Sequence, residues 1–76
     1  MEAKFSADKL REARTGNHLT QERLAEQAGI SVRYLRALES SHKSNPSASL
    51  LCRISLALGI PMDALMDISG EDNSAA

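Results

Sequence analysis

The sequence has few aromatic residues and only one cysteine, and each shortage excludes a class of protein. One Tyr, one Phe and no Trp among 76 residues are too few for the stacking surfaces that bind single-stranded nucleic acid. The lone Cys52 rules out an internal disulfide framework and fits a reducing compartment. No apolar run approaches the roughly 20 residues that cross a bilayer, and the beginning MEAKFSADKL lacks the apolar segment of a secretory signal. We therefore expect a soluble intracellular domain.

Patterns typical of catalysis and metal binding are also missing. His18 and His42 fall in different expected loops, with no cysteine or carboxylate at metal-ligand spacing. Asp63 and Asp67 share a helix face, but neither a base nor a nucleophile accompanies them. No glycine-rich phosphate loop occurs. We expect no enzyme, no metal, no cofactor and no small-molecule ligand, in a chain with room for one domain.

The charges are unevenly distributed, although the net charge is only -1. Residues 9–60 carry eight basic and four acidic side chains, whereas residues 61–76 carry four acidic side chains and no basic one. A basic body of this kind can present a positive face to a phosphate backbone. The same distribution also fits an ordinary solvated surface, so charge alone leaves both interpretations open.

Helix signals run along most of the chain, and strand signals are nearly absent. The expected helices cover residues 7–15, 21–28, 32–40 and 48–58, with N-caps at Ser6, Thr20, Ser31 and Ser47 and stops at Gly16, Gly29 and Gly59. Pro61 suits a first helical turn and opens a fifth helix to about Asp67. The sequence therefore predicts an all-α domain over residues 1–68, followed by a flexible polar tail over 69–76.

Apolar residues recur at helical spacing and define the expected core. They are Leu10, Ala13, Leu24, Ala25, Ala28, Ile30, Leu35, Leu38, Leu51, Ile54, Ala57, Leu58 and Leu65. Ala25 is small where two helices must approach closely, and Gly29 stands where the chain turns sharply. Two short helices joined by a glycine-containing turn, here residues 21–28 and 32–40, form a helix-turn-helix.

The second helix of this pair has a distinctive outer face. With Leu35 and Leu38 directed inward, its outward positions hold Val32, Arg33, Arg36, Ala37 and Ser40. A helix fits the major groove of B-DNA, where arginine donates to guanine O6 and N7 and small apolar groups meet the thymine methyl. The alternative is an amphipathic helix whose arginines only keep it soluble. That alternative explains less well why no acid precedes Glu39 on this face.

These features together resemble the Cro/C1-type helix-turn-helix family, also called the XRE family. The matching segments are LREAR, LTQERLAEQAGIS, YLRALE, NPS and LALGIPMDAL, which lie between about Lys9 and Met66. Gln21, Ala25 and Gly29 stand at the family's intervals, as do the two leucines of the next helix. The resemblance implies a compact, five-helix, lambda-repressor-like domain that binds double-stranded DNA.

The resemblance also implies roles for individual residues. Positions that face DNA bases are Val32, Arg33, Arg36 and Ala37, and positions that meet phosphates are Gln21, Ser31, Tyr34, Lys43, Ser44 and Asn45. Arg14 and Glu39 match a salt bridge that joins the first helix to the third in relatives, so we interpret Arg14 as structural and not as a phosphate contact. His18 holds a place where relatives commonly have glycine, and histidine tolerates left-handed backbone better than most residues.

A further apolar stripe suggests self-association. Leu56 shares a helix face with Cys52, and Met62 and Met66 add apolar surface nearby. We expect these residues to form a dimer interface, with Cys52 as a packing residue and not a redox switch. The alternative is that they complete a small core. A two-fold dimer would place two recognition helices about 34 Å apart, one turn of DNA.

The sequence thus predicts a sequence-specific, DNA-binding regulator of transcription that acts as a homodimer on a near-palindromic operator. It is expected in the cytoplasm, bacterial or phage-like and associated with the nucleoid, without a membrane partner. Such lone domains resemble phage-type repressors and the controller proteins of restriction–modification systems. Two alternatives stay open, namely a protein-interaction module such as an antitoxin-type partner, and the DNA-binding half of a longer regulator.

Overall fold

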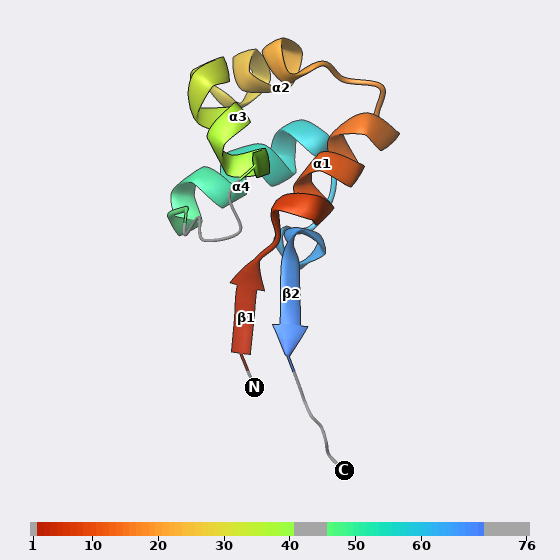
Figure 1. Ribbon diagram of the computed structural model, residues 1–76, viewed down its shortest axis with the longest axis vertical. Helices are drawn as coiled ribbons and strands as arrows, with labels where there is room; N and C mark the ends of the chain where they lie inside the picture. The colour runs from red at the N-terminus through yellow and green to blue at the C-terminus, as the bar shows by residue number, and fades with distance from the viewer. Residues whose placement is uncertain (1, 41–45, 70–76) are drawn as a thin grey trace.

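Four α-helices form the body of the protein in the computed structural model, which describes residues 2–40 and 46–69 (Figure 1). They are α1 (Ala7–Gly16), α2 (Gln21–Ala28), α3 (Val32–Ser40) and α4 (Ala48–Leu58). These bounds confirm the predicted helices to within one residue. The capping hydroxyls of Ser6, Thr20, Ser31 and Ser47 each accept the backbone N–H three residues on, at 3.0–3.2 Å. Each hydroxyl satisfies one of the donors left free in the first turn.

Two of these helices end at the glycines expected to stop them. Gly29 after α2 and Gly59 after α4 have left-handed backbone, with φ of +71° and +68°. The N–H that follows each glycine returns to the last helical turn, from Ile30 to the Ala25 carbonyl at 2.9 Å and from Ile60 to that of Ser55 at 3.1 Å. This arrangement satisfies carbonyls that a helix end leaves unpaired.

The end of α1 uses the same turn without a glycine at its left-handed position. Gly16 is the last residue of α1, and the left-handed residue is His18, with φ +58°. The N–H of Leu19 returns to the Arg14 carbonyl at 3.1 Å, which completes the turn. The prediction that Gly16 itself stops the helix by this mechanism is therefore wrong.

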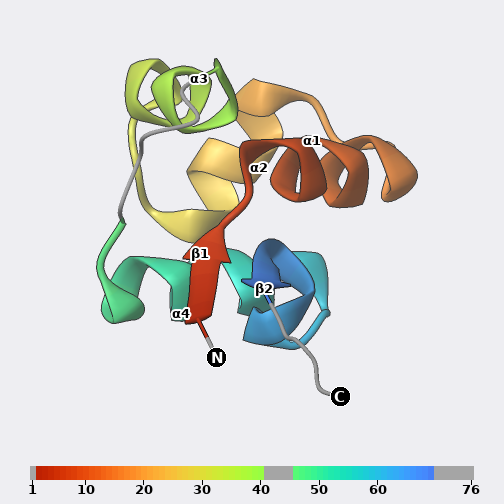
Figure 2. The same cartoon turned by 60° about the horizontal axis from the view of Figure 1, so that its bottom comes forward.

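The core lies where α1, α2, α3 and α4 meet. α2 packs against both α3 and α4, and α3 also packs against α1. Figure 2 shows α3 and α4 at opposite ends of the helical body. The side chains that are completely or almost completely buried are Leu10, Leu24, Leu35, Ile54 and Leu65. Every residue predicted for the core is buried or half-buried within this cluster, and Leu50 joins it.

The predicted fifth helix is wrong. Pro61 has extended backbone, with ψ 156°, and only Met62–Leu65 form a short 3₁₀ helix, η1. The backbone of Met66, at φ -119° and ψ 147°, is extended again, and a strand, β2 (Met66–Ser69), begins there. A segment this short gains too few hydrogen bonds to offset the nucleation of an α-helix.

β2 pairs with a second unpredicted strand, β1 (Glu2–Phe5), in an antiparallel ribbon. Lys4 lies opposite Asp67, and Phe5 lies opposite Met66. Phe5 and Met66 are half-buried against the core, whereas the oppositely charged pair is exposed. The described part of the chain is therefore mainly helical with a small two-stranded sheet, and not all-α.

Hydrogen bonds attach this ribbon to the helical body. The N–H of Ser6 donates to the Leu65 carbonyl at 2.9 Å. The Lys9 ammonium group donates to the Met66 carbonyl at 2.8 Å and lies 3.2 Å from the Asp67 carboxylate. β2 extends to Ser69, and the rest of the predicted tail, residues 70–76, lies outside the described residues.

The left-handed backbone of His18 generates a prediction about stability. Replacing His18 with Gly should raise the free energy of unfolding by about 0.5–1 kcal/mol, because relief of left-handed strain exceeds the added entropy of the unfolded chain. Urea unfolding followed by circular dichroism measures the change. His18→Ala is the control, because it removes the imidazole but keeps the strain. An equal gain in the control would show that the backbone is not the cause.

Candidate nucleic-acid interface

α3 presents a polar face to solvent from the edge of the molecule. Leu35 and Leu38 are buried beneath it. Arg33, Arg36 and Ala37 are exposed on its outer side. Both overall views place α3 at the surface, away from the β1–β2 ribbon (Figures 1 and 2). The helix therefore has an accessible face along its length.

The four residues predicted to face DNA bases differ in exposure. Arg33, Arg36 and Ala37 are exposed, whereas Val32 is half-buried and packs against the core. Arg33 is exposed and has no hydrogen bond or ion pair with any residue in the described ranges. Arg36 is held, since its Nε donates to Gln21 Oε1 at 3.3 Å.

The residues predicted to meet phosphates fall into three groups. Ser31 and Gln21 are already engaged inside the protein, because the Ser31 hydroxyl caps α3 and the Gln21 amide bonds at both ends. Tyr34 is 43% exposed, near the N-terminus of α3. Lys43, Ser44 and Asn45 lie outside the described residues.

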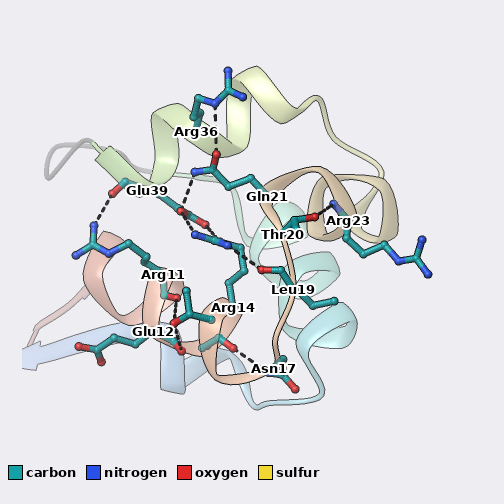
Figure 3. Close-up of polar contacts among 12 residues, drawn as sticks. Arg11, Glu12, Arg14, Asn17, Leu19, Thr20, Gln21, Arg23, Arg36 and Glu39 are labelled. Atoms are coloured by element: carbon teal, nitrogen blue, oxygen red, sulfur yellow. Dashed lines mark hydrogen bonds and ion pairs between the residues drawn. The ribbon is translucent and has the colours of Figure 1, made fainter.

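Arg14 and Glu39 form an ion pair beneath α3. Arg14 Nε donates to Glu39 Oε2 at 2.6 Å, and its Nη2 donates to Oε1 at 3.1 Å. The Glu39 side chain is 4% exposed and that of Arg14 13%. Arg14 Nη1 also donates to the Leu19 carbonyl at 2.8 Å (Figure 3). The pair therefore connects α1, the segment before α2, and α3.

Two further contacts in this cluster were not predicted. The Gln21 amide donates to Glu39 Oε1 at 3.0 Å, which brings α2 into the same network. Arg11 Nη1 donates to the backbone carbonyl of Glu39 at 3.4 Å. Helical periodicity could have indicated that Gln21, at the first position of α2, lies beside the third helix. It could not have identified the polar groups that Gln21 contacts there, because these depend on how the helices pack.

The predicted dimer residues do not form one exposed patch. Leu56 is 75% exposed, and Cys52 is exposed on the same side of α4. Met62 and Met66 are half-buried against the core. Cys52 is therefore exposed in the single chain, and its role as a packing residue of a dimer interface stays a prediction.

The described ranges contain no cluster of three metal-binding side chains. No helix among the same residues has both the length and the hydrophobicity to cross a membrane. What the site offers is a set of hydrogen-bond donors on one helix face, with the N-termini of α2 and α3 nearby. Helix N-termini and arginines are groups that bind phosphates and base edges.

The packed pair α2 and α3, with its glycine turn and exposed second helix, defines a helix-turn-helix protein. A family model described as helix-turn-helix matches residues 10–65. The chain belongs to this family, in its XRE-type branch. No sequence among the curated proteins matches the chain.

Solved structures share the fold. The restriction–modification controller protein C.AhdI from Aeromonas hydrophila is 32% identical with a TM-score of 0.72, and the match covers 78% of this chain and 88% of that one. SinR, the master biofilm regulator of Bacillus subtilis, solved in complex with DNA, is 27% identical with a TM-score of 0.74, over 78% and 94%. A structure titled CoII HppE in complex with substrate is 25% identical with a TM-score of 0.77, over 90% of this chain and 38% of that one.

The ion pair beneath α3 generates a prediction about stability. Arg14→Met should lower the free energy of unfolding by about 3–5 kcal/mol, because it leaves the Glu39 carboxylate buried without its cation. Arg23→Met is the matched control, since Arg23 is 65% exposed and lies 3.9 Å from Glu26. The control should change stability by less than about 0.5 kcal/mol. Urea unfolding compares the two, and equal effects would mean that the buried pair contributes no more than a surface pair.

Proposed function

We propose that the chain is a sequence-specific regulator of transcription that binds double-stranded DNA through α3. The observation that carries the proposal is the exposed face of α3, where Arg33 has no partner among the described residues and Arg36 and Ala37 lie beside it. Membership of the XRE-type family supports DNA as the partner, as does the likeness to SinR in complex with DNA. The proposal assigns binding, and no enzymatic activity, to the chain.

In this proposal α3 enters the major groove and phosphates orient the protein. Arg33 donates two hydrogen bonds to guanine O6 and N7, and Ala37 lies against a thymine methyl. The exposed part of Val32 contributes a second small apolar contact. The N-terminal N–H groups of α2 and α3, together with the Tyr34 hydroxyl, meet phosphates and fix the register without reading sequence.

We further propose that the chain acts as a homodimer on a near-palindromic operator, in the cytoplasm. Leu56 supports this step because it is a large apolar side chain, 75% exposed, next to exposed Cys52. Two recognition helices related by a two-fold axis would meet successive turns of the major groove. Dimerisation then makes operator occupancy depend on protein concentration.

A binding selection from random duplex DNA at about 0.15 M salt tests the function. An enriched inverted repeat, with half-site centres about 34 Å apart, is the expected result. A single enriched half-site would support DNA recognition but not the dimer. No enrichment, from protein that is folded by circular dichroism, would favour a protein-interaction module such as an antitoxin-type partner. A third candidate is the DNA-binding half of a longer regulator, and the match to only 38% of the HppE chain supports it insofar as this fold also occurs within a longer protein.

Arg33 generates a prediction about specificity. Arg33→Ala should weaken binding to the best operator by about 1–3 kcal/mol and relax the preference at one base pair. Titration of wild-type and variant operators measures both effects. Lys4→Ala is the control for loss of one positive charge, because Lys4 is exposed on β1, away from α3 (Figure 1). Unchanged affinity in Arg33→Ala would contradict the assignment of this face.

Leu56 generates a prediction about assembly. Leu56→Glu should shift the mass in analytical ultracentrifugation from dimer to monomer, because burying an unpaired carboxylate in an interface is costly. Gln27→Glu is the control, since it changes charge by the same amount at an exposed position of α2. A dimer that persists in Leu56→Glu would place the interface on another surface.

A further inference from the structure

A continuous chain of hydrogen bonds runs from the buried ion pair to the exposed face of α3 (Figure 3). The Glu39 carboxylate accepts from Arg14 and, through Oε1, from Gln21 Nε2 at 3.0 Å. Gln21 Oε1 accepts in turn from Arg36 Nε at 3.3 Å. Gln21 therefore links an interior carboxylate to an exposed guanidinium.

The two neighbours fix the orientation of the Gln21 amide. A carboxylate can only accept hydrogen bonds, and a guanidinium can only donate them. If the amide were turned over, its oxygen would face Glu39 and its NH₂ group would face Arg36, so both bonds would be lost. The amide oxygen is therefore presented to Arg36.

Few side chains could replace glutamine between these groups. A glutamate would bind Arg36 but would set a second carboxylate against Glu39 at about the same short distance. A lysine would bind Glu39 but would repel Arg36, and a methionine offers no donor and only a weak acceptor. The position needs one neutral group that donates on one side and accepts on the other.

The bond to Gln21 also determines which part of Arg36 stays available. Its Nε is occupied, and Figure 3 shows the remaining guanidinium nitrogens pointing away from Gln21. Nη2 lies 3.9 Å from Glu22 Oε2, with both side chains more than half exposed, so this ion pair holds it weakly. The free edge presents parallel N–H groups, which match guanine O6 and N7.

We propose that Gln21 is a positioning residue, which holds Arg36 ready to read a guanine and does not itself contact a base. The inference rests on the proposed function, because it requires α3 to meet the major groove. It makes the base pair read by Arg36 a G·C pair. Loss of Gln21 should therefore change specificity at that one pair instead of weakening binding to all sequences alike.

Parallel selections from random duplex DNA test this assignment. Arg36→Met identifies the base pair at which preference for guanine depends on Arg36. Gln21→Met should lose about tenfold of the discrimination at that same pair and keep the preference elsewhere. The double variant should lose no more there than Arg36→Met alone. A uniform loss of affinity in Gln21→Met, with its base preferences unchanged, would make Gln21 a plain phosphate contact and overturn the proposal.

Two control variants separate Gln21 from its surroundings. Gln27→Met makes the same substitution at an exposed position of α2 and should leave every base preference unchanged. Glu22→Gln removes the other neighbour of Arg36 and should raise affinity for all sequences alike, because it removes a negative charge near DNA. If Glu22→Gln, and not Gln21→Met, abolished the guanine preference, Glu22 would be the positioning residue.

A measurement on the DNA-free wild type tests independently whether Gln21 holds Arg36 in place. The ¹⁵N order parameter of Arg36 Nε should exceed that of Arg33 Nε. Arg33 lies on the same helix and has no partner among the described residues. Equal mobility of the two arginines would overturn the proposal, even if Gln21→Met does not fold. If the wild type enriches no DNA sequence, the proposed function fails, and the order parameters still report whether Gln21 holds Arg36.

Discussion

The buried ion pair between Arg14 and Glu39 sets the arrangement on which the proposed interface depends. It joins α1 to α3, and Arg14 also binds the Leu19 carbonyl in the segment that leads to α2. Gln21 brings α2 to the same carboxylate. The exposed face of α3 therefore takes its orientation from a polar cluster directly beneath it.

Directional hydrogen bonds fix the orientation of α3 better than apolar packing alone. Replacing a buried ion pair by well-packed apolar side chains is often neutral or even stabilising, so stability does not explain why charges lie here. A two-pronged arginine–carboxylate contact restricts both distance and angle, whereas packed leucines tolerate small shifts. In the proposed function, the face of α3 aligns Arg33 and Arg36 with base edges at the same time, and it gains from that restriction. The ion pair therefore contributes more to the orientation of α3 than to the stability of the fold.

The helices could be read from the sequence because their signals are local. Ser6, Thr20, Ser31 and Ser47 cap helices through bonds that span three residues, and apolar spacing identified the buried leucines. The β1–β2 ribbon could not be read, because it pairs the two ends of the described chain and each strand is only four residues long. The exposed arginines of α3 followed from periodicity. The link through Gln21 depends on the distance between α2 and α3, which periodicity does not specify.

The ribbon has a topological consequence. Glu2 and Ser69 are paired across it, so the two ends of the described fold are neighbours. A two-residue turn of the kind that closes β-hairpins could join them and convert residues 2–69 into a ring without stretching either strand. The ring would contain the helices α1 to α4, and the new junction would lie away from α3 (Figure 1). The helix-turn-helix is thus compatible with a circular backbone, in which the two strands could not fray apart from the end where Glu2 and Ser69 are paired.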